Sequence, residues 1–365
     1  MKNYFIIIII ALIFLSVQDK IFSQIPITLK VENYYDDNIY NNSMKTSDFI
    51  SSVSFSAGYN FESEKNNLQF YYMNNFGYFN ENLSKSSNSH KLGIVNTFLF
   101  AEDDNPLNIG INYSFRNNRD EYSTFDFNQL SLYANYRHSL SEDSFILLGY
   151  LFSKNDYKNL SVFSYNENKG FIKYSTTFST KTTLLIGSEI YFKNYMENTA
   201  DSSSKNGTSQ LSLYLNLSQS LAEYSGLSGY FNLRTNLTSS TRYLYSGDLI
   251  FYEEEIFNDI YSNDGYDFGV AFTQIISSKI SSKIELGYST RNFSNLQAAT
   301  IDGYYLNENR NDKQYAVGIE FLTNLNSIIT GLSASIKWNY IKNNSNDAFY
   351  LYDNQIFSIS FEWGL

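Results

Sequence analysis

Apolar and polar residues alternate with a period of two along almost the whole chain, and this pattern limits the possible folds more than any other feature of the sequence. In residues 107–116 (LNIGINYSFR), Leu, Ile, Tyr and Phe occupy every second position, and polar or small residues lie between them. Because successive side chains of a β-strand point to opposite faces, such a run predicts a strand with one apolar and one polar face. The same alternation recurs in residues 211–218, 227–237, 266–273, 284–291, 315–321 and 332–340.

The connections between these runs alternate in length. Tight polar turns are centred near Glu64, Asp104, Glu142, Lys181, Glu223, Lys279 and Leu325. Longer segments rich in Asn, Ser and Asp lie between them, at residues 80–89, 117–124, 197–208, 239–263, 295–312 and 343–348. This arrangement is typical of outer-membrane barrels. We therefore predict an all-β fold, a transmembrane antiparallel up-and-down β-barrel of about 16 strands (14 to 18), with short periplasmic turns and longer extracellular loops.

Residues 1–23 predict a secretory signal peptide. One Lys stands near the start, an apolar run extends from Tyr4 to Val17, and a polar stretch closes on Ser23. The apolar run is shorter than the roughly 20 residues that a spanning helix needs. An uncleaved N-terminal anchor is the alternative. Residues 24–365 would then form the barrel, surrounded by lipid in the outer membrane of a Gram-negative-type bacterium.

Composition excludes several classes of chemistry. The chain has 365 residues, a formal net charge of −11, no cysteine and two histidines. Without cysteine there is no disulfide, thiolate metal site or thiol nucleophile. An acidic balance without a Lys/Arg block argues against a nucleic-acid partner. The predicted topology places His90 and His138 at opposite rims, and no G-x-S-x-G, Walker, G-x-G-x-x-G or EF-hand pattern occurs. We therefore predict no enzyme, no cofactor and no metal site.

The cost of burying charge in lipid decides which face of each strand points inward. A Lys or Arg at mid-bilayer costs roughly 2 to 4 kcal/mol, so the apolar row should meet lipid and the polar row the lumen. Two roles remain open for the charged lumen residues: setting selectivity as pore-lining groups, or stiffening the wall as salt bridges. The predicted lumen-lining residues are Lys30, Glu32, Arg116, Arg137, Lys173, Glu189, Lys193, Arg234, Asp267, Glu285, Arg291, Glu320, Lys337 and Glu362.

The longest connection, residues 239–263, carries an acidic cluster. It could fold inward as a constriction favouring cations, stand outside as a binding surface, or consist of two strands that extend above the membrane. The cluster comprises Asp248, Glu253, Glu254, Glu255 and Asp259.

Two terminal segments resemble parts of known bacterial barrels. Residues 31–61 contain YDDNIY at 35–40, a short polar loop, and an alternating strand closing on GYNF. This resembles the first hairpin of porin-type outer-membrane barrels, some of which are associated with surface or exopolysaccharide gene sets. The final residues, QIFSISFEWGL, resemble the segment by which the barrel-insertion machinery recognises its clients. The resemblance implies a barrel, and the insertion machinery is the expected partner during biogenesis.

These observations predict a porin-like channel for passive passage or export of hydrated solutes, with saccharides among the candidates. One alternative is a closed or narrow surface barrel whose extracellular loops bind or shield, without transport. Another is a secreted soluble β-propeller, because the turn spacing near 40 residues matches a propeller blade. The sequence leaves the oligomeric state, the solute and the direction of transport open.

Overall fold

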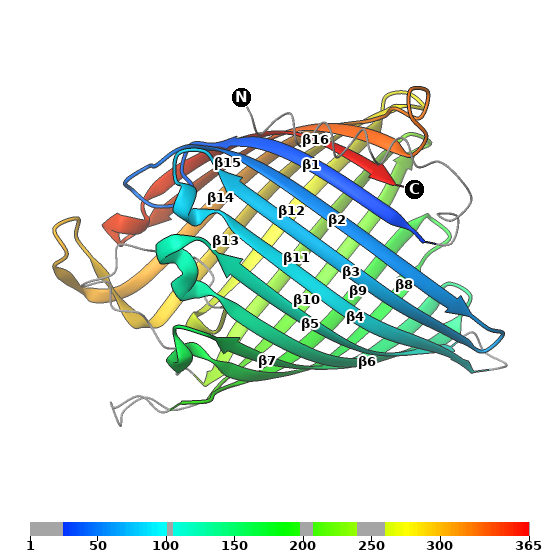
Figure 1. Cartoon of the computed structure of the whole chain (residues 1–365), viewed down its shortest axis with the longest axis horizontal. Coiled ribbons are helices and arrows are strands. Elements are labelled where there is room, and N and C mark those ends of the chain that lie inside the picture. Colours follow the sequence, from blue (N-terminus) through cyan, green and yellow to red (C-terminus); the bar gives the residue numbers. More distant parts are fainter. Residues whose placement is uncertain (1–24, 101–104, 198–206, 239–259, 365) are drawn as a thin grey trace.

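The computed structural model describes residues 25–100, 105–197, 207–238 and 260–364. Sixteen antiparallel strands form one closed barrel (Figure 1). In chain order they are β1 Ile27–Asp36, β2 Asp48–Glu62, β3 Asn66–Phe79, β4 Ser87–Phe100, β5 Asn105–Asn118, β6 Phe127–Ser141, β7 Ser144–Tyr157, β8 Tyr165–Thr177, β9 Thr182–Tyr195, β10 Gly207–Ala222, β11 Ser225–Thr238, β12 Asn263–Ile275, β13 Ile280–Ala299, β14 Tyr305–Asn324, β15 Leu332–Ser345 and β16 Tyr352–Gly364.

The barrel closes between its first and last strands. Every strand pairs with its neighbours in sequence, and β1 also pairs with β16, with Lys30 opposite Glu362 and Val31 opposite Phe361. Closure leaves no sheet edge without partners, which a sheet within lipid requires. The predicted up-and-down barrel is confirmed, and a propeller built from separate four-stranded blades is excluded.

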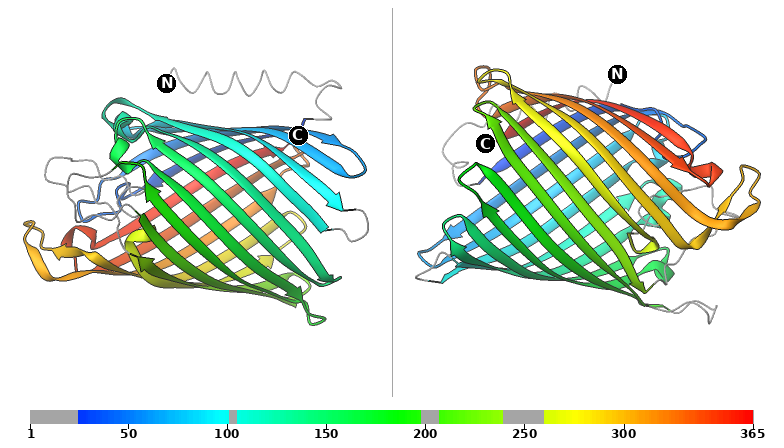
Figure 2. Two further views of the ribbon diagram at one scale, coloured as in Figure 1. Left: turned by 90° about the horizontal axis from the view of Figure 1, so that it is seen from below. Right: turned by 180° about the vertical axis from the view of Figure 1, so that it is seen from behind.

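Connection length differs between the two ends of the barrel. Two residues join β6 to β7 and β10 to β11, and six residues or fewer make most other turns at that end. The predicted turn near Asp104 lies outside the described residues. Longer connections with short 3-10 helices gather at the opposite end (Figure 2). We take the end with short turns as periplasmic.

One predicted loop is wrong. Residues 295–312 were expected to form a long connection, but β13 and β14 extend as a two-stranded hairpin with a turn at residues 300–304. Gly303 has a φ of 81°, which permits this tight turn. The outer ends of β13 and β14 do not alternate between apolar and polar residues, because strands that project beyond the lipid need no apolar face. The sequence pattern therefore could not identify them as strands. The connection between β7 and β8, residues 158–164, was also absent from the expected loops.

The outer surface of the barrel is apolar. Ile109 is 47% exposed, Leu213 44% and Phe268 44%, and all three lie in the outer rows of their strands. No second sheet covers them among the described residues. Transfer of such side chains from water to hydrocarbon is favourable. The fold is therefore that of an outer-membrane β-barrel, with a single wall in place of a packed core.

Within the described residues, no helix combines the length and apolarity needed to cross a membrane.

Candidate functional site: the inner wall of the barrel

Strand register decides which side chains share the inner face, since residues directly opposite each other point to the same side of a sheet. Leu213 pairs with Leu233, which pairs with Tyr266, and these belong to the outer row. Ser212 pairs with Arg234 in the inner row. Extended around the closed barrel, the pairing places all the charged residues that alternation assigned to the lumen in the inner row, namely Lys30, Glu32, Arg116, Arg137, Lys173, Glu189, Lys193, Arg234, Asp267, Glu285, Arg291, Glu320, Lys337 and Glu362.

Glu189 is the centre of an ion-pair cluster on β8 and β9. Its carboxylate lies 2.9 Å from the Lys169 ammonium and 3.5 Å from that of Lys173, and it accepts a hydrogen bond from the Tyr191 hydroxyl. Glu189 is only 9% exposed. Two cations therefore share one carboxylate, and the surplus positive charge faces the lumen. On the neighbouring wall, Arg234 and Asp267 approach to 3.6 Å.

Lys193 lies in an aromatic cage four residues beyond Glu189 along β9, toward the extracellular end. Its ammonium lies 4.0 Å from the centroid of the Tyr165 ring, 4.9 Å from that of Tyr195 and 5.4 Å from that of Tyr261. A desolvated cation over aromatic faces gains about 2 kcal/mol or more. Lys193 is 5% exposed, so its charge is held within the wall.

Tyr261 brings the end of the β11–β12 connection inside the barrel. It belongs to the 3-10 helix η5 (Ile260–Ser262) and is 2% exposed. Its hydroxyl donates to the Glu167 carboxylate of β8 at 2.7 Å, and the Gln210 amide of β10 donates to the Asn263 carbonyl at 3.4 Å. Because three strands separate β8 from β12, residues 260–263 cross the inner face and narrow the lumen near its extracellular end. The acidic cluster Asp248 to Asp259 lies outside the described residues.

A second group of charges is more open to water. Lys283 pairs with Glu285 at 2.5 Å and Lys30 with Glu32 at 2.9 Å, with side chains about 29% to 41% exposed. Glu320 and Lys337 are register partners. Exposed ion pairs contribute about 0 to 1 kcal/mol each. These groups therefore shape the potential of the lumen more than the stability of the wall.

A third sector, β3 to β7, carries cations alone. Within these strands the inner rows contain Lys91, Arg116 and Arg137 and no Asp or Glu. Arg137 stacks over the Phe145 ring at 4.3 Å, and Arg116 donates to the Asn118 amide oxygen at 2.9 Å. Although the whole chain has a negative net charge, the inner face of β3 to β7 therefore has a positive one.

Several inner-wall residues were missed by sequence reasoning. Glu167 and Lys169 lie an even number of residues before Lys173 in β8, so they share its face. Continuing the alternation along this strand would have found them. Lys91 and Lys283 follow the same rule. Tyr261 had no signal in the alternation, because it lies outside the strands.

Aromatic rings lie over glycines at one depth of the inner wall. A side chain added at Gly187 would meet the Tyr214 ring at 2.2 Å, and one at Gly110 would meet Tyr133 at 2.3 Å. The other pairs of this aromatic–glycine belt are Tyr71 with Gly93, Phe171 with Gly149, and Tyr230 with Gly269. Glycine leaves the space that lets each ring lie against the neighbouring strand. The belt keeps bulky aromatic side chains close to the wall.

The two histidines lie at opposite ends of the barrel, and neither belongs to an inner row. His90 lies near the loop end of β4 and contacts the Tyr72 hydroxyl at 2.8 Å; His138 lies near the turn end of β6 and stacks on Tyr136. Both belong to outer rows. In the part of the chain that is described, no group of three His, Asp or Glu side chains is arranged to hold a metal ion.

Loops pack together over one side of the extracellular mouth. Tyr122 and Phe125 of η3 (Asp120–Phe125) form an apolar cluster with Phe163 of η4 (Ser161–Phe163). The Tyr122 hydroxyl donates to that of Tyr40 in the β1–β2 loop at 3.1 Å. Three loops therefore support one another.

Asp48 fastens the β3–β4 loop to the rim. Its carboxylate accepts backbone hydrogen bonds from Asn80, Glu81 and Asn82, at 3.0, 3.0 and 2.8 Å, and is 2% exposed. Burial acts to raise the pKa of Asp48, but the hydrogen bonds from Asn82, Glu81 and Phe49 outweigh it and the pKa is lowered. The ionised carboxylate is thus the form that holds this loop.

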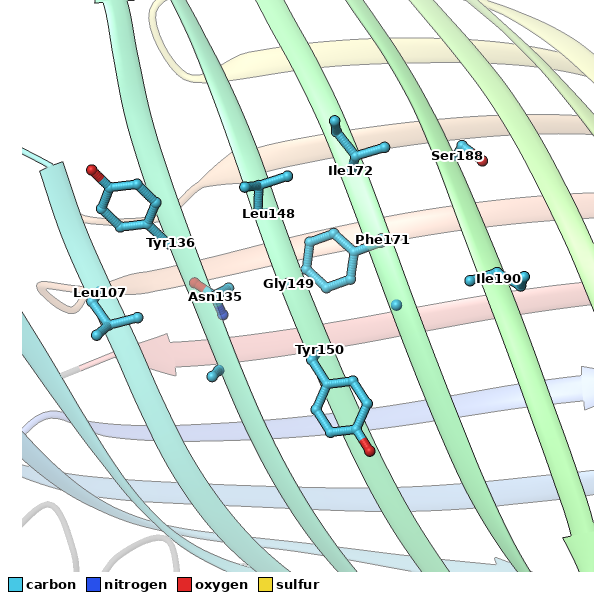
Figure 3. A pocket seen from close by; sticks show the side chains of 12 residues that line it. Leu107, Asn135, Tyr136, Leu148, Gly149, Tyr150, Phe171, Ile172, Ser188 and Ile190 are labelled. Carbon is cyan, nitrogen blue, oxygen red and sulfur yellow. The ribbon is translucent and has the colours of Figure 1, made fainter.

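The lipid face has a shallow hollow of about 560 Å³ over β5 to β9 (Figure 3). Small residues in the outer row, Ala134 and Gly170, form its floor, and Tyr136, Leu148 and Ile172 stand around it. Its lining is predominantly apolar, so acyl chains of the bilayer would fill it.

A closed barrel with an apolar outer row and a charged, amide-rich inner wall defines an outer-membrane β-barrel of porin-like type. The chain belongs to the surface lipoprotein assembly modifier family (SlipAM), whose model matches residues 165–364, more than half of its length. The match begins at the first residue of β8 and ends in β16.

Two solved structures are similar to this chain at very low sequence identity. OprD of Pseudomonas aeruginosa is 10% identical, with a TM-score of 0.50, covering 93% of this chain and 95% of OprD. OccK1 (OpdK) of the same organism is 10% identical, with a TM-score of 0.47, covering 93% and 98%. The likeness to OprD shows the fold alone. A search of curated proteins finds no match in sequence.

Proposed function

We propose that this protein is an outer-membrane conduit through which hydrated cargo crosses along the polar inner wall. The observation that carries the proposal is the difference between the two rows: the outer row is predominantly apolar around the closed barrel, and the inner row is rich in Ser, Asn and charged side chains. A barrel of about 16 strands is wide enough to hold water unless loops fill it. Residues 260–263 narrow this one without spanning all of its strands.

The test is single-channel recording of the refolded mature chain in planar bilayers. Stepwise currents are expected, with a conductance that changes when inner-row residues are substituted. The matched comparison is Lys173→Glu, which inverts a charge on the inner row of β8, against Tyr174→Leu, its outer-row neighbour. Absence of steps would favour the alternative of a closed surface barrel whose loops bind or shield.

A second candidate function is delivery of lipoproteins to the cell surface. The observation that favours it is membership of the surface lipoprotein assembly modifier family, whose match covers β8 to β16 and so includes the Glu189 cluster and Tyr261. In this second function, the barrel would carry a polypeptide and not a small solute. Co-expression with a candidate lipoprotein and protease shaving of intact cells tests it: surface exposure should depend on this chain and decrease when Glu189 is replaced.

The hypothesis that the cargo is a saccharide is supported only by the resemblance of the opening hairpin, residues 31–61, to porin-type barrels associated with exopolysaccharide gene sets. Saccharides added to one side of the bilayer should block the ionic current in a concentration-dependent way if they enter the lumen. Current that is indifferent to them would remove saccharides from the candidates.

A further inference from the structure

A polar pocket of about 270 Å³ lies at the extracellular rim, outside the inner wall described above. It is enclosed by the β1–β2 loop on one side and by the ends of β15 and β16 on the other. Its lining includes Asn38, Asn42, Ser43, Lys45 and Lys342. The pocket lies where the first and last strands of the barrel meet.

The depth of the pocket relative to the lipid follows from the outer row of β15. This row passes from Ile336 through Trp338 and Tyr340, whose rings stack with centroids 6.4 Å apart, to Lys342. Trp and Tyr prefer the boundary between hydrocarbon and headgroups. Lys342 lies two residues beyond Tyr340, or roughly 7 Å along the strand. That distance places the pocket at the level of the outer-leaflet headgroups, a layer about 5 to 7 Å thick on each side.

The walls of the pocket are built and held in place. Asn38 is fully buried, and its amide donates to the carbonyls of Asn42 and Asp353 at 2.8 and 3.0 Å. Lys45 has a positive φ of 53° and pairs with Asp353 at 2.5 Å and Asp37 at 3.5 Å. The loop therefore has a fixed shape with which to meet a ligand.

Unused hydrogen-bonding capacity remains in this region. The Ser43 hydroxyl is buried and has no partner within the described part of the chain, and the same holds for the amide oxygen of Asn354 behind the pocket. Lys342 is exposed and makes no ion pair with any described residue. Because the Ser43 and Asn354 oxygens are buried, the accessible group on this wall that lacks a partner among the described residues is the Lys342 ammonium, which is free to meet an anionic ligand.

We propose that this pocket binds the phosphorylated sugar headgroup of an outer-leaflet glycolipid. The exposed Asp353 carboxylate and Lys45 ammonium match the hydroxyls of a sugar ring, and the free Lys342 ammonium matches a phosphate oxygen. The exposed Leu351 on the pocket edge, 51% accessible, faces the less polar part of the ligand. Bound glycolipid would cover the seam between β1 and β16.

The experiment measures lipid binding to the detergent-purified full barrel by native mass spectrometry. Three probes are compared: a bisphosphorylated disaccharide glycolipid, phosphatidylglycerol, and a neutral monoglycosyl diacylglycerol. The proposal expects the phosphorylated glycolipid to bind most tightly, and Lys342→Met to weaken it about tenfold by removing a charge-assisted hydrogen bond. Ser43→Leu, which fills the pocket, should weaken all sugar-bearing probes.

The matched control is Lys154→Met, on the outer row near the loop end of β7, which should leave binding unchanged. Lys342 has no partner to lose, so its variant should fold even if Ser43→Leu does not. Equal affinity of wild type and Lys342→Met for the glycolipid would overturn the proposal. Equal binding of phosphatidylglycerol and glycolipid would also overturn it, because charge alone would then explain the affinity.

Discussion

The Tyr261 hydroxyl donates a 2.7 Å hydrogen bond to the Glu167 carboxylate, joining the segment before β12 to β8 across the inner face of the barrel. Tyr261→Ala should release this segment from the wall and increase single-channel conductance. Tyr261→Phe keeps the ring over Lys193 and loses only the hydrogen bond, so its effect should be smaller. Tyr174→Ala, on the outer row of β8, is the control. A conductance that is identical in all four proteins would show that residues 260–263 do not limit the lumen.

Glu189 should control the ionic preference of the inner wall. Glu189→Gln leaves the ammonium groups of Lys169 and Lys173 without their shared carboxylate, so the reversal potential in a salt gradient should move toward anion preference. The matched control is Asp156→Asn, which breaks the exposed Lys154–Asp156 pair on the outer row. A shift of equal size in both variants would argue against a local effect in the lumen.

Asp48 should make the barrel sensitive to acid. Its pKa is lowered in the folded state, so its contribution to stability is complete above the unfolded pKa of about 3.9 and is lost as the pH falls through the lower folded value. Asp48→Asn should lower the free energy of unfolding at pH 7 by about 1.5 to 3 kcal/mol, the worth of hydrogen bonds to a charged group. The difference from wild type should shrink below about pH 4. A constant difference across this range would contradict the assignment.

The aromatic–glycine belt predicts two glycine variants with different outcomes. Gly187→Ala places a methyl group 2.2 Å from the Tyr214 ring, so the ring must lift into the lumen, at a cost of about 1 to 3 kcal/mol. Gly170→Ala meets only Ile190 at 3.7 Å and should be tolerated. Urea unfolding of both variants measures the difference. In the double variant Gly187→Ala/Tyr214→Ala the cost of the methyl group should disappear; additive effects would show that the two residues do not interact.

The fold could be predicted from the sequence because lipid-facing strands leave a period-two signature in their residues. Leu211 to Ser218 show why: four leucines face lipid and the intervening residues face water. The signature fails where the lipid ends. Arg310 and Asp312 were expected in a loop, yet they lie in β14, 2% and 1% exposed, with the Arg310 guanidinium stacked 3.2 Å above the Tyr350 ring.

The composition of the inner wall could be predicted from the sequence, but its pairing could not. The alternation within each strand assigns Glu189 and Lys173 to the lumen. Their contact depends on how β8 and β9 are aligned, which the alternation does not determine. Tyr261 contacts residues of β8 and β9 that are distant in sequence, and no local pattern encodes such a contact. Whether the lumen charges select a solute stays a prediction.

The most direct test of the central claim uses the absence of cysteine from the natural sequence. Single cysteines placed at the neighbouring positions Leu215 and Asn216 of β10 should report the two faces of one strand in a bilayer. We expect Asn216→Cys to react with a membrane-impermeant maleimide through the water-filled lumen, and Leu215→Cys to react only with a lipid-soluble reagent. Equal labelling of both positions by the impermeant reagent, or labelling of Leu215→Cys alone, would contradict the account.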